Sequence, residues 1–191
     1  PSRTSAQHVY ADMNGRIPLI IDGGECKNGV ESTVICFTDG GKGIKVLRPG
    51  VITAEMLSRF AKTETDKNVF AKPDENEKVI SPGVKYKHYS PKADITIVET
   101  DSDEKLAEFL NDKNDGGTYG VIFGNETGIE IPTISYGNTA YEQAHNLFAV
   151  LRKTDELGAK CAYVRCPEKT GVGTAVYTRL LRAAAFKTII L

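Results

Sequence analysis

The sequence predicts an α/β protein, because short apolar segments alternate with amphipathic helical segments over its second half. The clearest strand-like segments are residues 95–98, 119–123 and 162–165, and helical patterns separate them. Strands that alternate with helices are joined by right-handed crossovers and form a mostly parallel sheet. We therefore expect a parallel sheet of about four or five strands in roughly the last hundred residues.

Local signals mark the helix ends in this half. Asp101 or Ser102 is expected to cap one helix, and Thr139 with Glu142 has the spacing of a capping box that opens another. Gly158 is the expected stop of that second helix. Its apolar face consists of Tyr141, Ala144, Leu147, Phe148 and Leu151.

Two more strands and a third helix complete this half. The helix is expected at residues 173–184, and residues 186–191 follow it as the last strand. Residues 131–136 are a weaker candidate, because Pro132 cannot donate to a strand ladder and suggests an edge strand or a loop.

The first part of the chain has shorter elements. Thr4 and Gln7 have the spacing of a capping box, so Thr4 is expected to cap a helix that Gly15 ends. Thr53 is expected to cap a second helix through residue 60. Its inward-facing side chains would be Met56, Leu57 and Phe60. Three strand-like runs lie between these helices, at residues 17–21, 30–37 and 45–47.

The charge is nearly balanced over the chain but unevenly distributed. The 191 residues include 24 Lys and Arg and 25 Asp and Glu, which argues against a protein that coats nucleic acid. Residues 1–92 carry 14 basic and 11 acidic side chains, and the rest carry 10 and 14. The sign changes near the polar residues 61–78, which resemble a linker in composition. The longest apolar runs are only a few residues, so we expect no membrane-spanning helix.

The cysteines and histidines do not predict a metal site. No cysteine belongs to a C-x-x-C pair, and the three histidines are scattered. We therefore expect reduced, partly buried thiols in a cytosolic protein. The four cysteines are Cys26, Cys36, Cys161 and Cys166.

A glycine-rich turn at residues 170–173 precedes the last helix. Free N–H groups at a helix N-terminus can bind an anion. A loop that needs unusual backbone angles explains the same glycines.

Hydroxyls and an arginine form a second candidate. Ser32 and Thr33 begin a strand, and Arg48 precedes Pro-Gly, where its backbone is restrained. Hydroxyl donors and a forked guanidinium suit a carboxylate or a phosphate. The alternative is a strand start and a surface ion pair.

Residues 85–89 combine two lysines, two tyrosines and a histidine. Such a segment could close over a nucleotide through stacking and charge. A solvated basic loop is the alternative.

Five segments with these features occur in one order. They are residues 1–9 (PSRTSAQHV), 20–24 (IIDGG), 29–33 (GVEST), 47–50 (LRPG) and 81–89 (SPGVKYKHY). In order and spacing they closely resemble the two-domain threonylcarbamoyl-AMP synthase family, over nearly the whole chain.

The resemblance implies three parts and an α/β fold. Residues 1–60 resemble the C-terminal part of a YrdC-like catalytic domain, and residues 61–91 resemble the interdomain linker. Residues 92–191 resemble the small Rossmann-like C-terminal domain, with a mostly parallel sheet. The expected fold is therefore an incomplete YrdC-like α/β domain, a linker and a Rossmann-like domain.

The resemblance also implies a reaction. The family joins L-threonine, bicarbonate and ATP into L-threonylcarbamoyl-AMP and pyrophosphate, for threonylcarbamoyladenosine formation in tRNA. This implies a cytoplasmic nucleotidyltransferase that uses ATP with Mg²⁺ and passes on a small-molecule product, without direct nucleic-acid binding. No side chain is expected to act as a covalent nucleophile, so the protein contributes positioning and charge stabilisation.

Site residues follow from the matched motifs. The resemblance assigns Ser32 to L-threonine and Arg48 to the phosphates of ATP. The linker of the family folds over the active site. The full set of expected ATP contacts is Ser2, Thr4, Arg48, Tyr86 and His88.

The N-terminal two thirds of the family's catalytic domain have no counterpart in these 191 residues. The chain is therefore expected to be a fragment that needs this missing part, and to expose apolar segments such as residues 17–21. An alternative is a non-catalytic nucleotide-binding or interaction module built on the C-terminal domain. A third possibility is a structural subunit that pairs with a separate N-terminal half.

The purified 191-residue chain is expected to lack synthase activity. The motif that grips the triphosphate in the family is not among these residues. The measurement is ATP- and L-threonine-dependent pyrophosphate release. Turnover by the purified chain would contradict the expectation.

Overall fold

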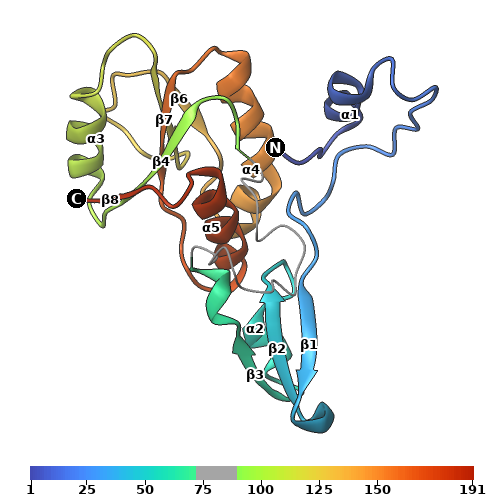
Figure 1. Cartoon of the computed structure of the whole chain (residues 1–191). Helices are drawn as coiled ribbons and strands as arrows, with labels where there is room; N and C mark the ends of the chain where they lie inside the picture. The colour runs from blue at the N-terminus through green and yellow to red at the C-terminus, as the bar shows by residue number, and fades with distance from the viewer. Residues whose placement is uncertain (72–89) are drawn as a thin grey trace.

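The computed structural model describes residues 1–71 and 90–191. Two sheets organise these residues (Figure 1), a five-stranded one in the second half and a three-stranded one in the first. The described residues include no helix long and apolar enough to cross a membrane.

The larger sheet is parallel throughout. Its strand order is β6-β5-β7-β4-β8, and each neighbouring pair runs in parallel register. The prediction of a mostly parallel sheet is therefore confirmed, with β6 at an edge as Pro132 suggested. The strands are β4 (Asp94–Glu99), β5 (Thr118–Ile122), β6 (Thr133–Ser135), β7 (Cys161–Arg165) and β8 (Thr188–Ile190).

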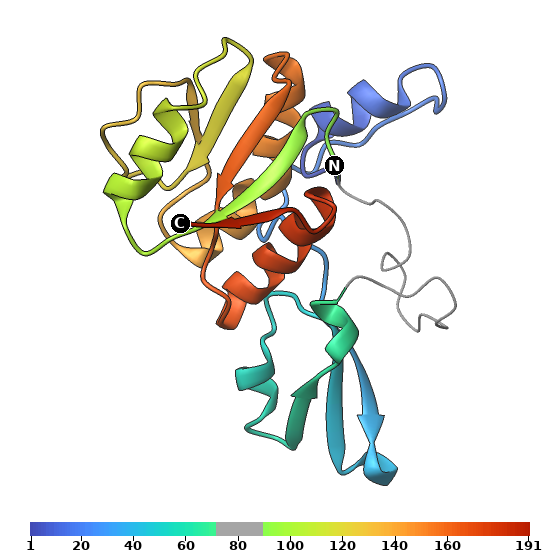
Figure 2. The same cartoon turned by 60° about the vertical axis from the view of Figure 1, so that its left-hand side comes forward.

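Helices cover both faces of this sheet. Helix α3 (Asp103–Asn111) lies on one face, and α4 (Ala140–Glu156) and α5 (Gly171–Ala183) lie on the other (Figure 2). The capping signals predicted for α3 and α4 are confirmed: Ser102 caps α3, and Thr139 with Glu142 forms a complete capping box on α4. These local hydrogen bonds satisfy N–H groups that the helices cannot satisfy internally.

The core consists of two apolar clusters, one on each face of the sheet. Alternate residues of β4 separate into them: Ile95 and Ile97 belong to the cluster under α4 and α5, and Val98 belongs to the cluster under α3. This is the alternation expected of a strand that is buried on both faces. The larger cluster includes Leu147, Phe148 and Leu151 of the predicted stripe, whereas Tyr141 in the first turn of α4 is 57% exposed, contrary to prediction.

The first part of the chain contributes a smaller mixed sheet. Strands β1 (Val34–Thr38) and β2 (Gly43–Arg48) pair in antiparallel fashion, and β3 (Lys62–Thr65) adds in parallel to β2. Two 3₁₀ turns, Asp39–Gly41 and Lys67–Val69, flank these strands. The sheet lies beyond α5, away from the larger sheet (Figure 1).

Strand β3 lies inside the segment expected to be a linker, residues 61–91. Its pairing with β2 shows that this segment begins with ordered structure, although its composition is polar. The sequence pattern missed it because β3 is an edge strand of alternating exposure and lacks an apolar run. Residues 72–89 lie outside the described residues.

Helix α1 (Ala6–Met13) begins one residue later than expected. Its cap is Ser5, whose side chain accepts a hydrogen bond from the N–H of His8, so the prediction of Thr4 as the cap is wrong. Thr4 instead contacts the ring of His8: its N–H and its hydroxyl each lie 3.2 Å from Nδ1. The imidazole thus replaces the glutamine expected to complete a capping box.

No strand forms at residues 17–21, and this prediction is also wrong. The described residues offer this segment no neighbouring strand, and an isolated strand leaves its backbone groups unpaired. Leu19 is 72% exposed and Ile21 is 86% exposed, as expected for an apolar segment without its packing partner.

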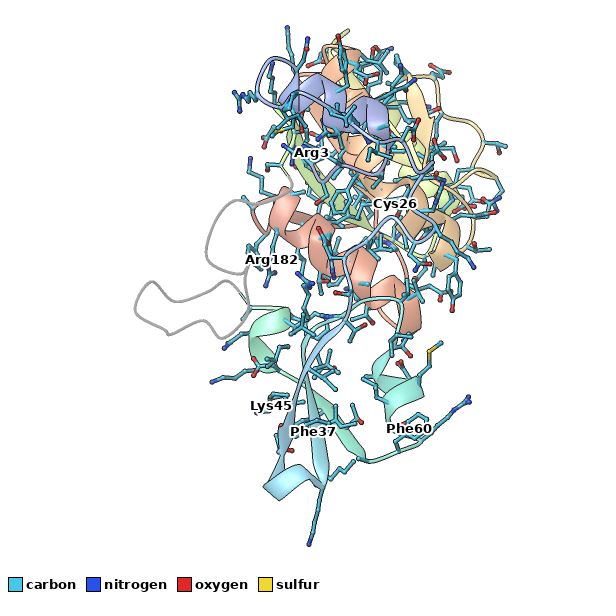
Figure 3. All side chains as sticks on the ribbon, turned by 90° about the vertical axis from the view of Figure 1, so that its right-hand side faces the viewer. Arg3, Cys26, Phe37, Lys45, Phe60 and Arg182 are labelled. Atoms are coloured by element: carbon cyan, nitrogen blue, oxygen red, sulfur yellow. The ribbon has the colours of Figure 1, made fainter. Side chains whose placement is uncertain are left out.

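Helix α2 (Ala54–Leu57) is capped by Thr53 as predicted but ends early. Phe60 therefore lies beyond the helix and is 84% exposed, where an inward position was expected. Figure 3 shows Phe60 and Phe37 at the end of the molecule formed by the small sheet. Both rings lie on the first part of the chain, outside the two core clusters.

Residues 92–191 are expected to fold on their own. The buried members of both apolar clusters come from residue 93 onward, and only the partly buried Val30 and Val51 of the first part pack against the larger one. A peptide of residues 92–191 should give a cooperative thermal melt, and Phe148→Ala should lower its free energy of unfolding by about 3–5 kcal/mol. An unfolded circular dichroism spectrum from the peptide would contradict this.

Candidate functional site

Two of the predicted site residues are in direct contact. Arg48 ends β2, and Ser32 lies two residues before β1, so the antiparallel pairing of these strands brings the two residues together. Nε of Arg48 donates to the carbonyl oxygen of Ser32 at 3.0 Å, and Nη2 lies 3.3 Å from its hydroxyl oxygen. Within the part of the chain that the structure describes, the partners of the Arg48 guanidinium are these two neutral oxygens, so the alternative of a surface ion pair does not hold there.

The backbones around this pair approach each other closely. A Cβ atom at Gly50 would lie 2.5 Å from the backbone nitrogen of Thr33 and 2.9 Å from the carbonyl oxygen of Glu31. The Thr33 hydroxyl donates to the carbonyl oxygen of Ile52 at 2.6 Å. Glycine is therefore required at position 50, and the segments 31–33 and 48–52 form one tightly packed unit.

A hollow of about 340 Å³ lies beside the pair. Hydroxyls and aliphatic groups both line it, which suits a small ligand with polar and apolar parts. Its lining residues are Asn28, Val30, Ser32, Thr33, Ile35, Val51, Ile52 and Leu57.

Glu31 lies immediately before Ser32 and joins this unit to two distant parts of the chain. Its carboxylate accepts a hydrogen bond of 2.7 Å from the Ser2 hydroxyl. Its other oxygen lies 3.1 Å from Nε of Arg179 in α5. Burial by itself raises the pKa of Glu31, but the charge of Arg179 and the Ser2 hydroxyl outweigh burial and hold the pKa below its ordinary value.

Ser2 therefore shares the surroundings of Ser32, but Thr4 does not. Thr4 is buried against His8 and lines a separate hollow of about 350 Å³ that includes Leu19 and Ile21. The sequence grouped Ser2 and Thr4 together, whereas the structure gives them different neighbours.

Tyr86 and His88 lie outside the described residues, so their predicted positions over the active site remain predictions.

Helix α4 also holds the beginning of the chain. The guanidinium of Arg152 donates to the carbonyl oxygens of Pro1 and Ser2, at 2.6 and 3.3 Å, and forms two hydrogen bonds with Asp12 of α1. The hydrogen bond from Arg152 holds the pKa of Asp12 below its usual range. Arg3 pairs with the same carboxylate at 2.9 Å.

Gly29 brings the next segment against α4. Its φ is +68°, and a Cβ atom there would lie 2.2 Å from the carbonyl oxygen of Ala144. Only glycine combines this backbone angle with so close an approach. Gly29 and Glu31 belong to the matched segment 29–33, but the sequence alone predicts no role for either. No local pattern in the sequence indicates that Arg152 or Arg179 holds the first segment.

The glycine-rich turn at residues 170–173 has a structural explanation. The N–H of Gly171 at the start of α5 donates to the Glu55 carboxylate at 3.4 Å, so a side chain of the first part already lies at this helix N-terminus. A Cβ atom at Gly173 would lie 2.1 Å from the carbonyl oxygen of Glu168. The structure therefore favours the packing interpretation of these glycines over an anion site.

The described residues hold no group of three or more His, Cys, Asp or Glu side chains that could bind a metal ion. All four cysteines are free.

These features define a class of protein: an α/β domain with a parallel sheet covered by helices on both faces. The segment before this domain packs against its helices and carries the Arg48–Ser32 pair beside a hollow. The family model for the threonylcarbamoyl-AMP synthase C-terminal domain matches residues 52–185. The chain belongs to this family, which confirms the resemblance. A second model, Sua5/YciO/YrdC, described as telomere recombination, matches residues 1–50.

Curated relatives carry the same family name. The chain is 37% identical over 195 residues to a threonylcarbamoyl-AMP synthase from Pyrococcus abyssi, and 36% identical over 197 residues to one from Bacillus subtilis. Each alignment covers 99% of this chain but only 56% and 55% of the relatives. The chain thus spans little more than half the length of these relatives.

Solved structures give the same result for the fold. The crystal structure of Sua5 from P. abyssi in complex with L-threonine matches the whole chain with a TM-score of 0.86 at 36% identity. The match covers 56% of that structure. The α/β fold, including the first segment, is therefore shared with that structure.

The contact between Glu31 and Arg179 is expected to make stability depend on pH. Because the folded-state pKa of Glu31 lies below its ordinary value of 4.5, the contribution is present above pH 4.5 and is lost as pH falls through the lowered pKa. Near pH 7, Glu31→Gln should lower the free energy of unfolding by about 1–3 kcal/mol, the range for hydrogen bonds to charged groups.

Urea unfolding from pH 3 to pH 7 measures this difference. Glu168→Gln, an exposed carboxylate on the loop before α5, is the matched control and should change stability by less than about 0.5 kcal/mol. A constant difference between wild type and Glu31→Gln at every pH would argue against the role of the Glu31 charge.

Proposed function

We propose that this chain is part of an L-threonylcarbamoyladenylate synthase. The reaction joins L-threonine, bicarbonate and ATP into threonylcarbamoyl-AMP and pyrophosphate, for threonylcarbamoyladenosine formation in tRNA. The observation that supports it most is the Arg48–Ser32 pair beside the hollow, in a fold that matches Sua5 complexed with L-threonine. The proposal concerns the complete gene product that contains these residues.

The hollow fits L-threonine in chemistry. An amino acid of this kind offers a carboxylate, an amine, a hydroxyl and a methyl group. The Ser32 hydroxyl would donate to a polar group of the substrate, and Val30 and Ile52 would contact its methyl group. Arg48 orients Ser32 through both its carbonyl and its hydroxyl, so the position of Ser32 depends on β2.

Arg48 would face the nucleotide. Within the described residues, its Nη1 group has no hydrogen bond, while Nε and Nη2 contact Ser32. A guanidinium fixed at two corners presents its remaining donors in one plane, which suits a phosphate. Ser2, with Tyr86 and His88 of the following segment, supplies the further nucleotide contacts of this proposal, whereas Thr4, buried against His8 beside a separate hollow, is not included among them.

The chemistry needs no covalent nucleophile from the protein. The amine nitrogen of L-threonine forms a C–N bond with bicarbonate, and water leaves. A carbamate oxygen then forms a bond to the α-phosphorus of ATP while the bond to the β-phosphate oxygen breaks and pyrophosphate leaves. The protein holds the reactants together and stabilises the phosphate charge.

Mg²⁺ would enter with ATP as part of the substrate and lie on its phosphate oxygens. We place the protein in the cytoplasm, which the four free cysteines support, and expect no direct contact with nucleic acid.

Arg48→Ala should lower kcat/KM for ATP about 10- to 100-fold in the complete gene product, the loss expected for a charge-assisted contact of about 1.5–3 kcal/mol. The measurement is L-threonine-dependent pyrophosphate release at varied ATP. Arg48→Lys should recover only part of the activity, because an ammonium cannot contact Ser32 and a phosphate in one plane.

Arg59→Ala is the control, since Arg59 is an exposed arginine just after α2. Its kinetic constants should equal those of the wild type. Wild-type kinetics for Arg48→Ala would remove Arg48 from the site, and absence of L-threonine-dependent pyrophosphate release in the wild type would refute the proposed reaction.

A further inference from the structure

Arg179 lies in the middle of α5, within the C-terminal domain, and its side chain extends toward the first part of the chain. The residue is only 3% exposed. Helix α5 runs between the large sheet and the small one (Figure 1), and Arg182, one turn further along it, lies on the same side as the small sheet in Figure 3. Arg179 is thus a buried cation at the junction of the two parts.

The guanidinium of Arg179 contacts the first part through three acceptors. Nε lies 3.1 Å from the carboxylate of Glu31, and Nη2 lies 3.3 Å from its carbonyl oxygen. Nη1 donates to the carbonyl oxygen of Pro49. One planar group therefore fixes two chain segments that are far apart in sequence.

Both segments carry a residue of the proposed site. Glu31 immediately precedes Ser32, and Pro49 immediately follows Arg48. We propose that Arg179 is a positioning residue of the substrate site, through which the C-terminal domain sets the placement of Ser32 and Arg48. This inference rests on the proposed function and assigns the C-terminal domain a part in it.

The contact is stiff at both ends. In α5, Val176 and Leu180 flank Arg179 and belong to the large core cluster, so the helix cannot shift without disturbing that core. On the other side, the close approach of Gly50 to Thr33 makes the two segments one packed unit. A shift of the Arg179 side chain is therefore expected to move Ser32 and Arg48 together.

The charges also favour positioning over direct substrate contact. The charge of Arg179 is compensated by Glu31, whose carboxylate Ser2 also contacts. A buried cation of this kind needs its partner, because removing one member leaves the other uncompensated. The guanidinium of Arg179 thus donates its hydrogen bonds to protein acceptors, whereas the Nη1 group of Arg48 is available for the substrate in this proposal.

Lysine at position 179 separates geometry from charge. Arg179→Lys keeps a cation near Glu31, but an ammonium cannot reach the Glu31 carboxylate, the Glu31 carbonyl and the Pro49 carbonyl in one plane. In the complete gene product, Arg179→Lys should lower kcat/KM for L-threonine at least about tenfold, at a temperature where the variant is fully folded. Hydrogen exchange should become faster in residues 29–33 and 47–50 and remain unchanged in β4 and β7.

Arg165→Lys is the matched control. Arg165 is also a buried, ion-paired arginine of the C-terminal domain, but its partners Glu126 and Asp103 lie within that domain. This variant should lose stability without a change in kcat or in KM for L-threonine. A merely structural role of Arg179 would give the same pattern as Arg165→Lys.

The outcomes separate the two proposals. An active wild type with faster exchange in the two segments and a raised KM or lowered kcat in Arg179→Lys supports the positioning role. Wild-type kinetics in a folded Arg179→Lys, or a loss that disappears once the protein is fully folded, overturns it. A wild-type protein without synthase activity refutes the proposed function itself, whatever the variants do.

Discussion

A buried guanidinium must find acceptors, and the Arg179 guanidinium reaches acceptors in the first part of the chain besides those in its own helix. Glu31 and Pro49 meet this demand, and in doing so they fix the first segment against α5. Arg152 does the same from α4 for Pro1 and Ser2. The elements between residues 1 and 50 have no core cluster of their own, so these polar contacts, Gly29 and the packing of Val30 against the large cluster determine where the segment lies.

This arrangement gives the C-terminal domain a physical part in the proposed chemistry. The parallel sheet and its two covering layers form a rigid support, and the proposed substrate residues lie in the segment held against it, Ser32 just before β1 and Arg48 at the end of β2. A reaction without a protein nucleophile depends on how accurately the protein positions the substrates. In this fold the position of the proposed site residues depends on contacts between residues more than one hundred positions apart in the sequence.

The sequence predicted the second half well because its signals are local. The capping box at Thr139, the cap at Ser102 and the alternation along β4 each act within a few residues. The first half was predicted less well: residues 17–21 have the composition of a strand but no partner, and β3 forms only because β2 is available to pair with it. Pairing partners are not encoded in a window of local sequence.

The sequence by itself determined the helices and strands of residues 92–191, the family, and the motifs that contain Ser32 and Arg48. Only the tertiary structure placed these two side chains in contact, separated Thr4 from Ser2, and brought Arg179 against Glu31 and Pro49, the residues next to both. The physical reason is that caps and alternation act over one turn or one strand, whereas a buried charge is satisfied by whichever acceptors the fold brings within 3 Å or so.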